Sequence, residues 1–217
     1  MYALALLCFF GLLVYRHSRL SEQEMAVIPK RIGDRLTKLW DIAYHGMREN
    51  RFLRAEKALL TILKIDEKNA AAYNRLGILY AKQREYKDAI DCFEIASSIE
   101  PSASSLHNLG LIYYETENYQ KAAAAFEQAL KLDEGLAARH IAYAKVQEKI
   151  GNDKLLLQSL ERAAELEPNP ETYNLLIKAY EAQDMPNEAS VLQQKLGKLI
   201  MPAGRPKRIL RPKRVVI

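Results

Sequence analysis

The sequence contains few of the residues from which chemical sites are built. It has only two cysteines in 217 residues, Cys8 and Cys92, and no Cys-x-x-Cys pair. Two cysteines cannot form a disulfide framework, and without that spacing neither a zinc site nor a thiol redox motif is indicated. Their scarcity favours a reducing compartment. Glycine-rich phosphate loops, nucleophile elbows and paired carboxylates are also missing.

The four histidines do not indicate a metal or catalytic site either. His17, His45, His107 and His140 have no cysteine or carboxylate at metal-ligand spacing. We therefore expect no catalytic residue, no metal, no cofactor and no small-molecule substrate, and we predict that the chain is not an enzyme. His140 is interpreted as a packing residue and Cys92 as a small apolar residue of a packed helix. The composition, 49% hydrophobic and 27% charged, is typical of a globular protein.

Positive charge is concentrated at the two ends of the chain. Seven basic residues and no acidic one lie from Lys198 onward, and six basic residues face three acidic ones between Arg16 and Lys38. Since the total is +5, the remaining residues 39–197 carry about −5. An acidic body is thus flanked by two basic segments.

The longest uncharged run is at the start of the chain, "MYALALLCFFGLLVY". As a helix, residues 1–15 would be about 22 Å long, shorter than the ~30 Å hydrocarbon core of a bilayer. We interpret them as a hydrophobic signal-anchor or transmembrane helix, followed by a basic juxtamembrane segment over residues 16–35. Because basic residues follow this run, the remainder of this single-pass membrane protein is expected in the cytoplasm. A cleaved signal peptide and a buried first helix are the alternatives.

Three segments of the chain align without gaps. They are "YNRLGILYAKQREYKDAIDCFEIASSIEP" from Tyr73, "LHNLGLIYYETENYQKAAAAFEQALKLDE" from Leu106 and "YNLLIKAYEAQDMPNEASVLQQKLGKLIM" from Tyr173. Five matched pairs in the first two segments are 33 residues apart, which indicates an internal repeat. The pairs are Gly77 and Gly110, Tyr80 and Tyr113, Ala89 and Ala122, Phe93 and Phe126, and Ala96 and Ala129.

This pattern resembles the tetratricopeptide repeat over residues 36–200. The resemblance implies an all-α fold, a right-handed superhelical solenoid of about five helix-turn-helix units, preceded by the short hydrophobic N-terminal helix. The units are expected near 36–69, 70–102, 103–136, 137–169 and 170–200. The second and third carry the pattern most fully, whereas the fifth has Ile177 in place of the glycine.

The residue pattern also predicts the local structure without the family name. The pattern of each unit predicts two amphipathic helices joined by a polar turn. The predicted turns include "KQRE", "ETEN", "KIGND" and "AQDMP". Gly77, Gly110 and Ala144 are small where the first helix of a pair must lie close to the second. We expect Phe52, Tyr86 and Tyr119 to begin second helices, and prolines such as Pro101 and Pro168 to end the helices before them.

A solenoid of this family implies a concave wall, built mainly by the first helix of each pair, that binds a protein or peptide. Aromatic and amide side chains on such a wall suit an extended or helical peptide. The best-known ligand mode of the family holds a C-terminal carboxylate, but the matching basic pattern is incomplete here. Trp40 fits the core of an end repeat as well as it fits the wall. The expected partner-binding residues are Tyr44, Asn74, Ile78, Lys82, His107, Leu111, Tyr114, Lys145, Asn174 and Lys178, together with Trp40 and Ile141.

The last segment, residues 201–217, is predicted to be a flexible basic tail. Its three prolines and glycine cannot continue a helix, and the tetrapeptide Arg-Pro-Lys-Arg occurs twice. An anionic lipid surface is the expected contact. Non-specific nucleic-acid binding and a merely solvated tail are the alternatives. The residues expected to bind an anionic surface are Arg205, Lys207, Arg208, Arg211, Lys213 and Arg214.

These observations predict a membrane-tethered scaffold or adaptor that binds a protein or peptide partner. The layout is similar to that of membrane-tethered tetratricopeptide assembly factors of bacteria, although it lacks their cysteine-rich metal module. An exported, signal-cleaved factor for envelope or pilus assembly is one alternative. An adaptor that touches nucleic acid through its basic tail is another.

Overall fold

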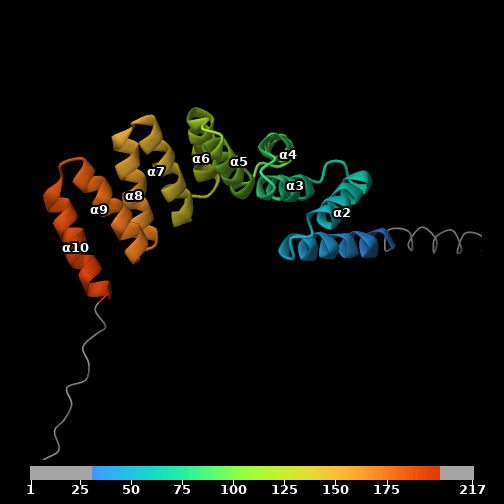
Figure 1. Ribbon diagram of the computed structural model, residues 1–217, viewed down its shortest axis with the longest axis horizontal. Coiled ribbons are helices and arrows are strands. Elements are labelled where there is room, and N and C mark those ends of the chain that lie inside the picture. Colours follow the sequence, from blue (N-terminus) through green and yellow to red (C-terminus); the bar gives the residue numbers. More distant parts are fainter. Residues whose placement is uncertain (1–30, 201–217) are drawn as a thin grey trace, which may run out of the picture. The chain divides into compact units, whose positions relative to one another are not determined.

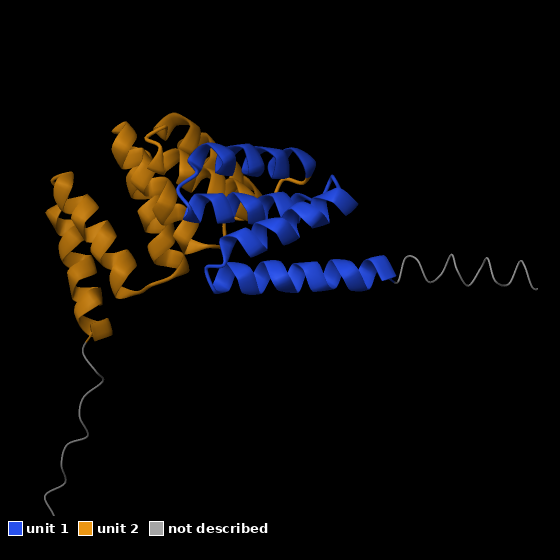
Figure 2. Ribbon diagram, turned by 45° about the vertical axis from the view of Figure 1, so that its right-hand side comes forward, with its two compact units in different colours: residues 1–99 blue, residues 100–217 orange. Residues whose placement is uncertain are grey.

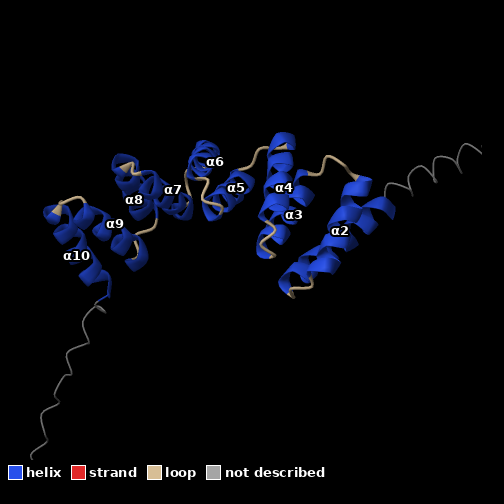
Figure 3. Cartoon of the chain, turned by 45° about the horizontal axis from the view of Figure 1, so that its top comes forward, coloured by secondary structure: helices blue, strands red, loops and turns tan. Residues whose placement is uncertain are grey.

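The computed structural model describes residues 31–200, which are helical and contain no strand (Figure 3). The predicted anchor over residues 1–15 and the predicted basic tail over residues 201–217 lie outside this range. Between residues 31 and 200, no helix is both long and apolar enough to cross a membrane. The same range holds no group of histidine, cysteine, aspartate and glutamate arranged to bind a metal ion.

The chain divides into two compact units, Met1–Ile99 and Glu100–Ile217 (Figure 2). In the first unit, a helix over residues 31–48 is followed by α2 (Phe52–Ile65), α3 (Ala70–Lys82) and α4 (Tyr86–Ile99). The second unit consists of α5 (Ala103–Glu115), α6 (Tyr119–Leu132), α7 (Ala137–Ile150), α8 (Asp153–Leu166), α9 (Pro170–Ala182) and α10 (Pro186–Ile200). Consecutive helices of each unit pack on one another (Figure 1). The prediction of an all-helical repeat is confirmed over this range.

Helix starts follow from polar residues just before them. Asn69, Ser102, Asn118, Asn152 and Asn169 each accept a hydrogen bond from a backbone N–H group of the first turn. These bonds satisfy donors that have no partner within the helix. The predicted first residues of three second helices are confirmed: Phe52 begins α2, Tyr86 begins α4 and Tyr119 begins α6.

Every turn within a helix pair contains one residue with a left-handed backbone. Each is followed by a residue whose N–H group donates to a carbonyl five residues earlier, as from Glu85 to Tyr80 and from Asn118 to Tyr113. This bond closes the helix end in the Schellman arrangement. The left-handed residues are Asn50, Arg84, Glu117, Gly151 and Asp184, with φ between 57° and 82°.

Each unit has its own apolar core at the contact between paired helices. In the first unit Ala43, Leu59 and Leu76 are buried, and a methyl group at Gly77 would lie 2.7 Å from the Phe93 ring. In the second unit, a methyl group at Gly110 would lie 2.9 Å from the Phe126 ring. Ala144 is fully buried in the second unit's core. The predicted need for small residues at these positions is confirmed.

Candidate partner-binding groove

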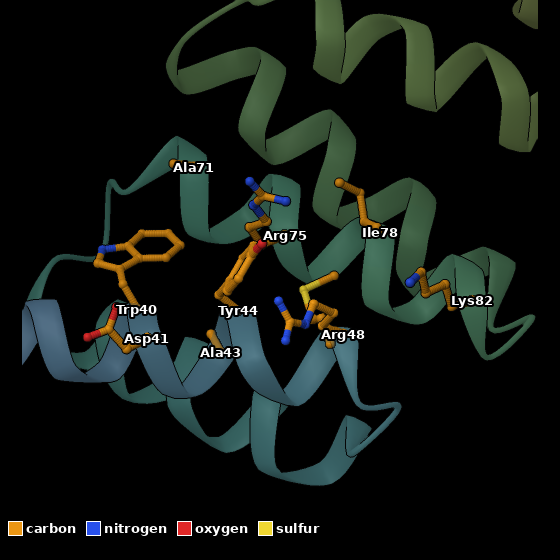
Figure 4. Close-up of a pocket in the computed structure, with 10 residues that line it drawn as sticks. Trp40, Asp41, Ala43, Tyr44, Arg48, Ala71, Arg75, Ile78 and Lys82 are labelled. Carbon is orange, nitrogen blue, oxygen red and sulfur yellow. The ribbon is translucent and has the colours of Figure 1, made fainter.

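A cavity of the first unit lies between the helix over residues 31–48 and α3. Trp40, Tyr44 and Arg48 are spaced four residues apart, so they occupy one face of the first of these helices. On α3, Arg75, Ile78 and Lys82 line the same cavity. Figure 4 shows the first three side chains on the helix over residues 31–48 and the other three on α3. We call this cavity the first-unit groove. Its remaining lining residues are Asp41, Ala43, Met47 and Ala71.

The first-unit groove has an apolar base and an accessible aromatic wall. Its volume is about 560 Å³, and the base is formed by the buried residues Ala43 and Met47. Tyr44 is 57% exposed although it is a large aromatic residue. Trp40 is half-buried, since it packs against the core and also lines the groove.

Three cations surround this base. Arg48, Arg75 and Lys82 all line the groove, and none of them forms an ion pair with any residue between 31 and 200. Asp41 is the acidic lining residue. The groove therefore combines a positive rim with exposed aromatic surface.

Another part of the predicted set lies on the second unit. Lys145 and Lys178, with Ile141, line a slot of about 150 Å³ between α7, α8 and α9. The slot is otherwise mainly apolar, with Leu156 and Leu175 among its lining residues. The two lysines are 33 residues apart and thus occupy the same position in successive repeats.

Two predicted residues, Asn74 and His107, line neither cavity. They are 33 residues apart, and both are half-buried. The Oδ1 atom of Asn74 and the Nδ1 atom of His107 are buried without a hydrogen-bond partner among residues 31–200. The His107 ring makes an edge contact with Phe126, with the ring centroids 5.3 Å apart. Burial, and then the nearby Arg139 charge, lower the pKa of His107. This histidine is a packed residue of its helix pair.

The remaining predicted residues are dispersed. Leu111 and Asn174 are exposed, and Tyr114 packs edge-on against Tyr119 at 5.7 Å between centroids. The six tail cations, from Arg205 to Arg214, lie outside the described residues. The structure therefore brings Trp40, Tyr44, Ile78 and Lys82 together in the first-unit groove, and it brings Ile141, Lys145 and Lys178 together in the slot of the second unit.

Three polar lining residues were not predicted: Asp41, Arg48 and Arg75. Arg48 has a sequence signal, because it follows Tyr44 by four residues as Lys82 follows Ile78. Arg75 and Asp41 have a signal of the same kind, because Arg75 precedes Ile78 by three residues and Asp41 precedes Tyr44 by three.

The shifted titratable groups of the first unit are explained by packing. Burial, followed by the charges of Asp88 and Asp91, raises the pKa of the Cys92 thiol to about 11. The Tyr80 hydroxyl donates a 2.8 Å hydrogen bond to Glu56, and burial together with this bond raises the pKa of Tyr80. A thiol with so high a pKa is a poor nucleophile at neutral pH. In the second unit, the His140 ring nitrogen Nε2 lies 2.9 Å from the Glu134 carbonyl, as expected for a packing residue.

Comparison with known proteins agrees with this architecture. The family model described as "Tetratricopeptide repeat" matches residues 68–135. The predicted resemblance to the tetratricopeptide repeat is therefore confirmed for residues 68–135. A comparison with curated proteins finds no match.

Several solved structures share the fold. A crystal structure of the MamA protein is similar with a TM-score of 0.67 and 23% identity, covering 75% of this chain and 90% of that one. A MamA structure from Desulfovibrio magneticus RS-1 has a TM-score of 0.68 and 15% identity, covering 76% and 95%. YrrB, described as a TPR protein with an unusual peptide-binding site, has a TM-score of 0.62 and 20% identity, covering 73% and 82%. At these identities the similarity defines the fold alone.

Proposed function

We propose that this protein is a binding scaffold that holds a segment of a protein partner in the first-unit groove. The observation that carries the proposal is the convergence of Trp40, Tyr44 and Ile78 on one open cavity of about 560 Å³. An exposed tyrosine and a half-buried tryptophan beside a buried apolar base are typical of the residues that dominate binding energy at protein interfaces. The presence of a peptide-binding site in YrrB, which has a similar fold, supports a peptide as the ligand class.

Site-specific photo-cross-linking tests this function. The photoreactive residue p-benzoylphenylalanine replaces Tyr44 in the full chain, which is expressed in its own cells and irradiated. We expect a discrete cross-linked partner that disappears when Ile78→Glu is added, because a charge at the centre of the groove prevents apolar contact. The same probe at Lys64, an exposed position of α2 outside the groove, is the matched control. Equal products from both positions would contradict the proposal.

The sequence also supports a finer proposal about location. Residues 1–15 would tether the scaffold to a membrane, with the basic tail on an anionic leaflet. This rests on the uncharged run and the basic residues that follow it. After alkaline extraction of membranes, a full-mass protein in the pellet is expected. A protein recovered in the supernatant, or one that lacks its first residues, would refute the tether and leave the groove proposal intact.

A further inference from the structure

We infer that the first-unit groove selects an acidic, amphipathic segment, in which side-chain carboxylates flank an aromatic or aliphatic anchor. This inference rests on the proposed function and specifies its partner. Three features of the structure support it: the charge of the groove, the absence of internal partners for that charge, and the spacing of the cations.

The charge of the groove is opposite to that of the body that carries it. Residues 39–197 have a net charge of about −5, yet Arg48, Arg75 and Lys82 converge on one cavity against a single acid, Asp41. A cleft lined by one sign of charge raises the local concentration of ligands of the opposite sign. An acidic segment is therefore favoured at this place on the surface.

These cations are also available to a ligand. Some surface cations of the described residues are paired with nearby carboxylates, as Lys131 is with Glu127 at 2.7 Å and Arg162 with Glu165 at 3.0 Å. Arg48, Arg75 and Lys82 have no such pair among residues 31–200. An incoming carboxylate can thus accept charge-assisted hydrogen bonds, including a bidentate one from either arginine, without displacing an internal partner.

The apolar part of the groove requires more than charge from its ligand. Trp40, Tyr44 and Ile78 line the groove together with the cations and offer surface that an apolar side chain would cover. A run of acidic residues alone would leave this surface in water and forgo most of the hydrophobic gain. The preferred segment therefore contains an apolar anchor as well as carboxylates.

The spacing of the cations indicates several carboxylates rather than one chain end. Arg75 and Lys82 are seven residues apart on α3, which corresponds to about 10 Å along the helix. Arg48 lies on the facing helix. Cations distributed over this length match the carboxylates of alternate residues in an extended segment, which are about 6.6 Å apart, better than a single terminal carboxylate.

Peptide display with the full chain as bait tests this inference. The library consists of random twelve-residue peptides fused at their C-termini, so that no free terminal carboxylate is present. Selected peptides are then synthesised with amidated ends, and binding is followed by the fluorescence of Trp40, the one tryptophan of the chain and a lining residue of the groove. We expect selected sequences rich in aspartate and glutamate around an aromatic or aliphatic residue.

A pair of matched triple variants isolates the role of the groove cations. One carries Arg48→Glu, Arg75→Glu and Lys82→Glu. The control carries Lys64→Glu, Lys68→Glu and Lys87→Glu, which change the net charge equally at exposed positions outside the groove. We expect the groove variant to weaken binding at least tenfold and the control variant to change it less than threefold. The control should have the smaller effect because salt largely screens the interaction between exposed charges that lie more than a Debye length apart. Circular dichroism establishes that both are folded.

The outcomes separate this inference from the function on which it rests. If neutral or basic peptides are selected and alter Trp40 fluorescence, the groove binds peptides and the acidic preference is wrong. The preference is equally wrong if both triple variants bind alike. If no selected peptide alters Trp40 fluorescence, the groove is not a peptide site, and the proposed function fails together with the inference.

Discussion

At the scale of single residues, two glycines determine how closely the paired helices approach. Gly77 on α3 faces the Phe93 ring, and Gly110 on α5 faces the Phe126 ring. An added methyl group would lie 2.7 Å and 2.9 Å, respectively, from these rings, closer than carbon atoms pack. Phe93 and Phe126 are almost completely buried, so neither ring can move away without disturbing its core.

We therefore predict that Gly77→Ala destabilises the protein by about 1–3 kcal/mol, the usual cost of overpacking a core. Gly197→Ala is the control, because this glycine lies within α10 with no atom near its added methyl group. Alanine there is expected to stabilise by about 0.5–1 kcal/mol through helix propensity. Denaturant titration of both variants measures these changes. Equal effects of the two substitutions would refute the steric account.

A second residue-scale prediction concerns Tyr44. Because it is 57% exposed, Tyr44→Ala removes little buried surface and should shift the free energy of unfolding by less than about 0.5 kcal/mol. If the groove binds a peptide, the same substitution should weaken that binding about tenfold or more, as truncating an aromatic anchor does. Val191→Ala, at an exposed position of α10, should change neither quantity. Titration by calorimetry with a selected peptide provides the measurement.

At the scale of elements, the helix pairs share one way of closing their first helix. The residue in the left-handed conformation is glycine at position 151 but arginine, glutamate or aspartate at 84, 117 and 184. A side chain in this conformation costs roughly 1–2 kcal/mol, which glycine avoids at the expense of greater entropy in the unfolded chain. The turns at Arg84, Glu117 and Asp184 are thus strained relative to a glycine turn, and the turn at Asn50 also has a non-glycine residue in this conformation.

This comparison predicts opposite effects of two substitutions. Arg84→Gly should stabilise the protein by a few tenths to about 1 kcal/mol, since Arg84 is exposed and its φ of 63° suits glycine. Gly151→Ala should destabilise it by about 1 kcal/mol, because alanine would adopt a φ of 82°. Thermal unfolding of both proteins measures the difference. Loss of stability in Arg84→Gly would show that the arginine side chain contributes contacts that outweigh its backbone strain.

At the scale of the whole molecule, stability should depend on pH through His107. Burial and the Arg139 charge lower the pKa of His107 in the folded protein below its ordinary value of 6.5. The unfolded chain therefore binds the proton more tightly than the folded one. The stability that neutral His107 contributes is fully present above pH 6.5, and it is lost as the pH falls below that value.

The prediction can be tested by comparing the protein with His107→Gln. As the pH falls from 7 to 5, the unmodified protein should lose more unfolding free energy than the variant, with a difference in slope of at most about 1.4 kcal/mol per pH unit. Glutamine cannot titrate, so carboxylate effects common to both proteins cancel. Parallel pH profiles would show that His107 does not couple protonation to folding.

Much of the helical architecture is readable from the sequence, for identifiable reasons. Gly77 and Gly110 are 33 residues apart, and so are Phe93 and Phe126. This recurrence reveals the paired helices, because each glycine contacts the phenylalanine of its own repeat. The sequence also predicted the residues that begin α2, α4 and α6, which are Phe52, Tyr86 and Tyr119, since the patterns of turns and helix starts are local. The left-handed residues of the turns were not, because Arg84, Glu117 and Asp184 are not residue types that signal this conformation.

The sequence by itself determined which faces of the helices are apolar and which small residues permit close packing, since both depend on neighbours within a few turns. Only the tertiary structure decided which side chains share a cavity. Helical spacing indicated Tyr44, Ile78 and Lys82, but the way the helix over residues 31–48 meets α3 added Arg75 and Asp41 and left Asn74 outside the groove. The reason is physical: a groove belongs to the contact between two helices, and the rotation of each about its axis depends on the whole core beneath it.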